Sequence, residues 1–103
     1  MLELSKKTFI ASILFVDIVG YSKRPVEKQL DIKNHLNQSI AHAIDDIPEA
    51  ERILLDTGDG AALCFLSRPE EALEVALSLR QQITDSEYAL ENGYQLRMGI
   101  NLG

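Results

Sequence analysis

An apolar segment that ends in an aspartate constrains the fold of this chain more than any other feature. Residues 8–17 are almost entirely apolar as far as Val16, and Asp17 follows directly. A segment that is apolar on both faces predicts a central strand that is covered on both sides. A carboxylate is out of place at the end of such a strand, so Asp17 is a candidate functional residue, although a turn or helix-capping role would also explain it alone.

A second aspartate lies in a predicted tight turn. Thr57-Gly58-Asp59-Gly60 separates two apolar segments, Arg52–Asp56 and Ala61–Leu66, as in a β-hairpin. Taken alone, an Asp-Gly turn is usually structural. Two carboxylates brought together would suit a hard cation such as Mg²⁺, which commonly takes one or two carboxylates plus phosphate oxygens.

Two helices are predicted from apolar spacing and end signals. The first begins near Pro25, carries Leu36, Ile40, Ile44 and Ile47 on one face, and ends at Pro48. The second follows a predicted capping box at residues 67–70, Ser-Arg-Pro-Glu. Its apolar face comprises Ala72, Val75, Ala76, Leu79 and Ile83.

The order of the predicted elements defines the fold class. With a turn at Asn92-Gly93 and a last strand over Tyr94–Asn101, the order is β-α-β-β-α-β. This is the α+β, ferredoxin-like arrangement, an antiparallel sheet with two helices on one face. Its first and third strands are central neighbours, so we expect Asp17 and Asp59 to approach each other.

The loop after Asp17 is a candidate anion site. In the segment Ile18–Arg24, Gly20 would allow close backbone approach. The amides of Ile18, Val19, Gly20, Tyr21 and Ser22 precede a helix, where anions bind favourably. A predicted metal pair and a predicted phosphate-binding loop therefore coincide.

Composition narrows the class of protein. A chain of 103 residues is expected to form one domain, and its net charge of −6 argues against a nucleic-acid surface. The single cysteine, Cys64, cannot form an internal disulfide, which fits a reducing compartment. No apolar segment suggests a signal peptide or a membrane span, so we expect a cytoplasmic protein without membrane association.

Three motifs, in order, resemble those of the class III nucleotidyl cyclases. Residues 15–22, Phe-Val-Asp-Ile-Val-Gly-Tyr-Ser, resemble the first metal motif of that family, and residues 57–65 resemble the second. Residues 97–103, which begin Arg-Met-Gly-Ile, resemble the third block. The resemblance extends over residues 9–103, which would make residues 1–103 one cyclase domain that stops after its fourth strand.

The resemblance implies an activity and a set of roles. Asp17 and Asp59 would hold two Mg²⁺ or Mn²⁺ ions, with the Ile18 carbonyl as a further ligand. Arg97 and the amides of residues 18–22 would bind the triphosphate. A nucleoside triphosphate would be converted to a 3′,5′-cyclic nucleotide and pyrophosphate in a homodimer.

Two departures from the family pattern leave alternatives open. Leu55 stands where the family has a base-selecting lysine or glutamate, so ATP, GTP and a pyrimidine nucleotide all remain candidate substrates. The family's transition-state asparagine and arginine come from a region that residues 1–103 do not include. A non-catalytic cyclase-fold domain is therefore the alternative, and an unrelated ferredoxin-like binding module is a third hypothesis. His35 and His42 share a helix face that we expect to be solvated.

Overall fold

The structure, a computed structural model, describes residues 11–102, and β1 (Ser12–Ile18) lies at the centre of its sheet. The other elements follow in the order η1 (Tyr21–Lys23), α2 (Val26–Ala43), η2 (Glu49–Glu51), β2 (Arg52–Asp56), β3 (Gly60–Phe65), α3 (Glu71–Thr84), α4 (Glu87–Asn92) and β4 (Leu96–Leu102). The predicted strand over residues 8–17 is thus observed from Ser12, and residues 8–10 lie outside the described part.

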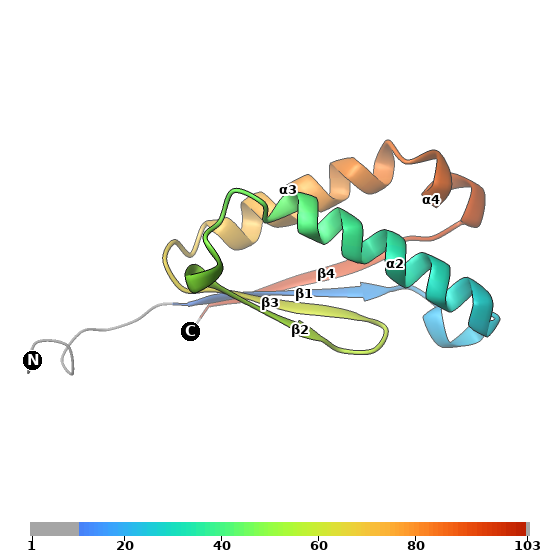
Figure 1. Cartoon of the computed structure of the whole chain (residues 1–103), viewed down its shortest axis with the longest axis horizontal. Coiled ribbons are helices and arrows are strands. Elements are labelled where there is room, and N and C mark those ends of the chain that lie inside the picture. Colours follow the sequence, from blue (N-terminus) through green and yellow to red (C-terminus); the bar gives the residue numbers. More distant parts are fainter. Residues whose placement is uncertain (1–10, 103) are drawn as a thin grey trace, which may run out of the picture.

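The four strands form one antiparallel sheet in the order β2-β3-β1-β4. Helices α2 and α3 pack on one face of it, and no helix among residues 11–102 lies on the other face (Figure 1). The predicted α+β, ferredoxin-like fold is confirmed, including the central pairing of the first and third strands. Among residues 11–102, no helix is both long and apolar enough to cross a bilayer.

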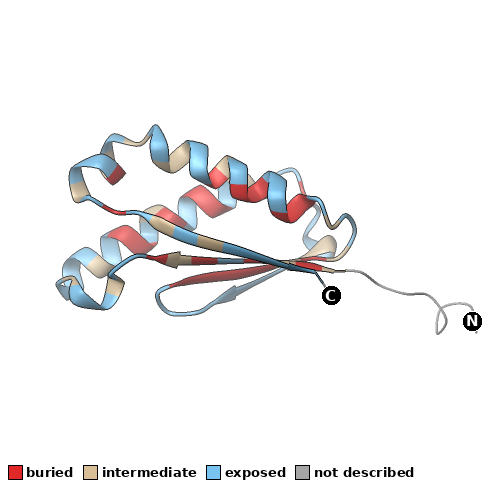
Figure 2. Ribbon diagram, turned by 180° about the vertical axis from the view of Figure 1, so that it is seen from behind, coloured by how far each residue is buried: buried red, intermediate tan, exposed pale blue. Residues whose placement is uncertain are grey.

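The prediction that the first strand is covered on both sides is wrong. Leu14 and Val16 are fully buried beneath the helices, whereas Phe15 between them remains 42% exposed. Alternate residues of a strand point to opposite faces, so one side of β1 meets the helices and the other meets solvent. Figure 2 shows the same division along β1 as alternating buried and more exposed segments.

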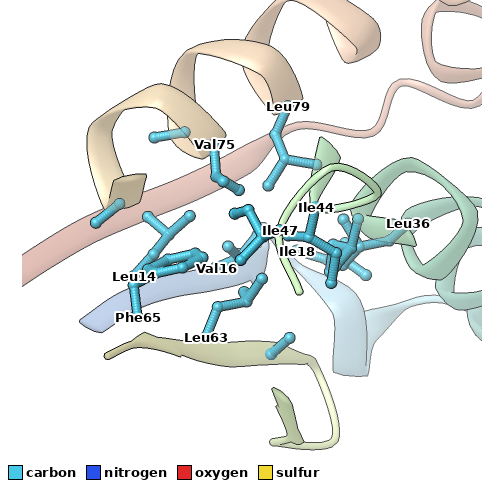
Figure 3. Packing of buried hydrophobic residues seen from close by; sticks show 14 of the residues in the cluster. Leu14, Val16, Ile18, Leu36, Ile44, Ile47, Leu63, Phe65, Val75 and Leu79 are labelled. Carbon is cyan, nitrogen blue, oxygen red and sulfur yellow. The ribbon is translucent and has the colours of Figure 1, made fainter. Parts of the chain in front are cut away.

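The core lies between the sheet and the two helices (Figure 3). Its fully buried members include Phe65 and Leu63 from β3, Leu36 from α2 and Leu79 from α3. Each such side chain contributes about 1.5–3 kcal/mol when it leaves water. The core therefore fixes how β1 and β3 lie against α2, the helix that follows the candidate loop.

Helix α2 ends at Ala43 and not near Pro48 as predicted. Ile44 and Ile47 remain buried after the helix has ended, which is why the apolar spacing appeared to continue. Asp45 and Asp46 follow at the negative end of the helix dipole, where carboxylates are unfavourable. The helix therefore ends at Ala43, and Ile44 and Ile47 remain in the core although they follow the helix.

The start of α3 also differs from the prediction. The helix begins at Glu71, its N-cap residue is Glu70, and no side chain caps it, so the predicted capping box at Ser67 is wrong. Arg68 instead donates to Glu74 at 2.9 Å and lies 3.8 Å from Glu71. Acidic residues in the first turn, held by one arginine, take the place of the cap.

Helix α4 was not predicted. Ser86 caps its N-terminus by accepting the Ala89 N–H at 3.1 Å, and Gly93 ends it in the left-handed conformation at φ 59°. The predicted turn at Asn92-Gly93 is thus a helix C-cap. The last strand consequently starts at Leu96 and not at Tyr94.

Candidate functional site

Asp17 lies on the helix-free face of the sheet, in line with two other residues of the predicted site. Its register partners are Gly60 on β3 and Arg97 on β4. Directly paired residues of antiparallel strands project to the same face. The half-buried Asp17 carboxylate and the exposed Arg97 guanidinium therefore occupy one row across the open face.

Asp59 is joined to β1 through the backbone. The Ile18 N–H donates to the Asp59 carbonyl at 2.9 Å, so the hairpin turn lies directly beside the end of β1. In a strand the N–H and C=O of one residue point to the same side, so the Ile18 carbonyl is also directed toward the hairpin. Segments that are distant in sequence thus meet as predicted, and the Asp59 side chain is exposed there.

The two glycines of the hairpin turn have different functions. A Cβ atom on Gly60 would lie 1.7 Å from the Val16 carbonyl oxygen, so only glycine permits β3 to approach β1 this closely. Gly58 has φ +91°, a conformation that L side chains rarely adopt. Both glycines are therefore required for the turn that carries Asp59.

A buried lysine anchors the hairpin from the helix side. Lys33 of α2 donates to the Asp56 carboxylate at 2.8 Å and to the Gly58 carbonyl at 3.1 Å. The Lys33 hydrogen bond, followed by that from the Gly58 N–H, lowers the pKa of Asp56. Asp56 thus faces α2, opposite to Leu55, and the sequence signal that was overlooked is a lysine beside the apolar stripe of α2.

The loop after Asp17 offers fewer free amides than predicted. The Ile18 N–H bonds the Asp59 carbonyl, and the Val19 N–H bonds the Gln95 carbonyl at 2.9 Å. Neither amide is available to an anion, which corrects the prediction for these two residues. The amides of Gly20, Tyr21 and Ser22 have no acceptor among residues 11–102.

Gly20 is needed for a reason other than the predicted one. A Cβ atom at this position would meet nothing within 4 Å, so close backbone approach is not the constraint. Its φ of +67° is the constraint, because the chain turns through the left-handed region before η1.

An apolar row lies next to the row of Asp17. Leu55, Ala62 and Phe15 are consecutive register partners across the open face. Leu55 is 59% exposed and has no group that could hydrogen-bond a base edge. The predicted base-contacting position is therefore part of an apolar surface beside the polar row.

His35 belongs to an aromatic cluster and not to a solvated face, so that prediction is wrong. Its Nδ1 lies 2.9 Å from the Tyr94 hydroxyl and its Nε2 lies 3.3 Å from Ser86 Oγ. Its ring stacks on Tyr88 at a centroid distance of 4.7 Å. These contacts connect α2 to α4, while His42 remains exposed.

Arg24 links the loop to the same region. Its guanidinium donates to the Asn92 carbonyl at 2.8 Å and to the Gly93 carbonyl at 3.0 Å. These carbonyls belong to the C-terminal end of α4, where a cation is favourable. The 18–24 segment is thus held by the hairpin turn at Asp59 on one side and by residues 92–95, between α4 and β4, on the other.

Comparison with known proteins shows a similarity to a solved structure. No protein-family model matches this chain, nor does any curated protein. A crystal structure of an adenylate/guanylate cyclase/hydrolase from Silicibacter pomeroyi superimposes with a TM-score of 0.69 and 28% sequence identity. The match covers 91% of this chain and 56% of that chain.

The chain has a cyclase-like fold. It spans little more than half of the cyclase that it matches, and nearly all of its own length takes part in that match.

The oxygen donors of the candidate site suit one class of metal ion. Among residues 11–102, no three His, Cys, Asp or Glu side chains converge to hold an ion. Asp17 and Asp59 would contribute two carboxylates, with the Ile18 carbonyl directed to the same side. Oxygen ligands completed by substrate phosphates suit Mg²⁺ or Mn²⁺ better than zinc, which is usually held by three or four protein ligands.

Proposed function

We propose that this chain is the nucleotidyl cyclase domain of a class III cyclase, which converts a nucleoside triphosphate to a 3′,5′-cyclic nucleotide and pyrophosphate. The observation that carries the proposal is the junction of Asp17, the Asp59 hairpin and Arg97 at one end of β1. The similarity to an adenylate/guanylate cyclase/hydrolase over 91% of the chain supports it.

Asp17, Asp59 and the Ile18 carbonyl would hold two Mg²⁺ or Mn²⁺ ions. When bound, such ions assist deprotonation of the ribose 3′-hydroxyl and neutralise charge on the triphosphate. Gly60 and Lys33 keep the Asp59 hairpin against β1, since one permits the close approach and the other bonds the turn. The chain would therefore preorganise the carboxylates before substrate arrives.

Arg97 and the free amides of the loop would bind the phosphates. A guanidinium presents a fork of N–H donors that matches phosphate oxygens, and Arg97 is exposed on the same face as Asp17. The amides of Gly20, Tyr21 and Ser22 would donate to the opposite end of the triphosphate. The amides of Ile18 and Val19 would not contact the phosphates, because they donate to the carbonyls of Asp59 and Gln95.

The Leu55 side chain has no hydrogen-bonding group with which the site could select a nucleobase. An apolar row at Leu55 and Phe15 can contact any base through dispersion, but it cannot distinguish hydrogen-bonding edges. We therefore infer that selection among ATP, GTP and a pyrimidine nucleotide depends on groups elsewhere, including those of a second subunit in a homodimer. The substrate class and the free Cys64 thiol favour a cytoplasmic location.

A second candidate function is a cyclase-fold domain that binds without turnover. The observation in its favour is that this chain spans 56% of the cyclase that it matches. Metal-dependent nucleotide binding is common to both candidates, whereas product formation separates them.

The test is calorimetric titration of each of the four nucleoside triphosphates with Mn²⁺. We expect Mn²⁺-dependent binding that Asp17→Asn and Asp59→Asn each abolish, because each removes one anionic ligand. Asp46→Asn, which removes an exposed carboxylate at the other end of α2, should bind as the wild type does.

All four proteins should unfold at similar temperatures, since neither site aspartate supports the core. Binding that persists in both Asp17→Asn and Asp59→Asn, or no binding to any nucleotide by the wild type, would contradict the proposal.

A further inference from the structure

A hollow of about 420 Å³, which we call the α2–α3 hollow, lies between the C-terminal end of α2 and the N-terminal end of α3. The end of β3, from which the chain enters α3, pairs with the start of β1. The hollow therefore lies where β1 begins, whereas the candidate site lies where β1 ends, beside the hairpin turn (Figure 1). Among residues 11–102, no residue of β4 lines it.

The lining of the α2–α3 hollow is strongly acidic. Its four carboxylates come from the segment after α2 and from the first turn of α3, and they belong to Asp45, Asp46, Glu71 and Glu74. Four carboxylates and the Arg68 guanidinium give the lining a net charge of −3 when His42 is neutral. Arg68 donates to Glu74 at 2.9 Å, and no ion pair involves Asp45 or Asp46 among residues 11–102. The hollow therefore attracts cations.

One of these carboxylates is buried and only partly satisfied. The Glu71 side chain is 7% exposed, and its Oε1 has no hydrogen-bond partner among residues 11–102. Its Oε2 lies 3.8 Å from the Arg68 guanidinium, which is beyond hydrogen-bond distance. A buried carboxylate oxygen is normally hydrogen-bonded, because burial without a partner is costly. Glu71 thus brings an unused acceptor to a hollow that already carries excess negative charge.

The end of α2 adds to the negative potential. Ala43, the last residue of α2, lines the hollow, and the Ile47 N–H bonds the Ile44 carbonyl and not that of Ala43. The last carbonyls of a helix carry partial negative charge and favour a cation. The positive end of α3 explains acidic residues in its own first turn, but it does not explain Asp45 and Asp46 at the negative end of α2.

The distribution of the carboxylates decides which class of cation fits. Among residues 11–102, no three His, Cys, Asp or Glu side chains converge to hold a metal ion. Carboxylates spread around a hollow instead suit a cation that carries several separated charges. The buried side chains of Ile47 and Val75 also line the hollow, and they offer an apolar wall to an alkyl chain between such charges.

We propose that the α2–α3 hollow binds an aliphatic polyamine. One ammonium group donates to Glu71 Oε1, a second lies between Asp45 and the end of α2, and the methylene chain between them lies along Ile47 and Val75. The bound polyamine offsets the repulsion among the carboxylates and connects the two helix ends. The proposal does not rest on the proposed function, because none of these residues belongs to the candidate site.

Calorimetric titration of the full chain with spermidine, without nucleotide, tests the binding. We expect binding at a single site that weakens as the salt concentration rises, because added ions screen the charges. Butylamine carries one charge and should bind at least about tenfold more weakly, since it loses a charged contact. No detectable binding of spermidine at low salt, or equal binding of butylamine, would overturn the proposal.

Two substitutions test the assigned carboxylates. Glu71→Gln keeps the shape of the buried side chain and removes its charge, so spermidine should bind at least about tenfold more weakly. Asp45→Asn changes an exposed residue that does not support the core, and it should weaken binding in the same direction. The matched control is Glu91→Gln, which removes an exposed carboxylate of α4 and should bind as the wild type does. Unchanged affinity in both Glu71→Gln and Asp45→Asn would overturn the proposal.

Nuclear magnetic resonance of the nitrogen-15-labelled chain tests the location. Spermidine should shift the backbone amide signals of residues 42–47 and 68–78 and leave those of α4 unchanged. Equal shifts at Glu87 and Glu91 would indicate attraction to the net charge of −6 and no defined site, which would contradict the proposal. Mg²⁺ that matched spermidine in affinity and in the residues shifted would also overturn it, because the hollow would then hold an inorganic cation.

Discussion

Gly60 and Gly99 illustrate how differently two glycines of one sheet are constrained. At Gly60 the backbone of β3 lies so close to the Val16 carbonyl that no side chain fits. At Gly99 the space above the open face is free. The first glycine is therefore fixed by the packing of β3 against β1, which also brings Asp59 to the end of β1.

Gly60→Ala is expected to destabilise the fold by about 3 kcal/mol, because the added methyl group forces β3 away from β1. Urea unfolding followed by circular dichroism measures the change. Gly99→Ala is the matched control and should change the free energy of unfolding by about 1 kcal/mol or less, since its φ and surroundings accept a side chain. Equal effects of the two substitutions would show that the close approach at Gly60 does not constrain the fold.

At the scale of elements, the short helix α4 depends on contacts from α2 and from the loop. A neutral His35 ring satisfies its neighbours when Tyr94 donates to Nδ1 and Nε2–H donates to Ser86, which also accepts the Ala89 N–H. Burial raises the pKa of Tyr94 well above its usual value, so its hydroxyl keeps the proton. Because Arg24 holds the other end of α4, this cluster also supports the candidate loop.

The cluster predicts a pH dependence of stability. Burial lowers the pKa of His35 below the ordinary histidine value of about 6.5, so at a pH between the folded and unfolded pKa values the unfolded chain binds more protons than the folded one. The contribution of His35 to stability is thus complete above pH 6.5 and declines as the pH falls through its folded pKa. We expect His35→Gln to flatten the decline of the free energy of unfolding below pH 6.5.

Denaturant unfolding at pH 7.5 and at several values down to pH 5 measures this slope. His42→Gln provides the control, because His42 lies on the same helix and is exposed. An unchanged slope in His35→Gln, or an equal change in His42→Gln, would exclude His35 as the source.

At the scale of the whole molecule, one face of the sheet carries no helix among residues 11–102 (Figure 1). The candidate site lies on this open face. The structure that this chain resembles contains considerably more chain than the region that matches. Nucleotide binding by this chain can therefore be tested separately from catalytic turnover.

We expect the 103-residue chain to form cyclic nucleotide at least about 10²-fold more slowly than a full-length class III cyclase assayed beside it, because transition-state donors are typically worth that much each. The family's asparagine and arginine are not present in the motifs that this sequence contains. Mass spectrometry of reactions with Mn²⁺ and each nucleoside triphosphate measures the products. A comparable rate from this chain would contradict the expectation and favour a complete site.

The order of the strands and the meeting of two loops could both be predicted from the amino-acid sequence. The apolar spacing of the two long helices indicates which side of each is buried, and the Asp-Gly turn at Asp59 defines a hairpin. The ferredoxin-like topology then places β1 beside β3. Asp17 and the Asp59 turn could therefore be brought together before any coordinates were known.

Which backbone and side-chain groups remain available at the site depends on long-range contacts that the sequence pattern does not show. The amides of Ile18 and Val19 are used by carbonyls of Asp59 and Gln95, segments distant in sequence, so local pattern could not reveal their loss. Lys33 and His35 carry polar groups whose partners lie on β2 and at either end of α4. Burial and hydrogen bonding of such side chains depend on long-range neighbours, and one-dimensional periodicity contains no information about these.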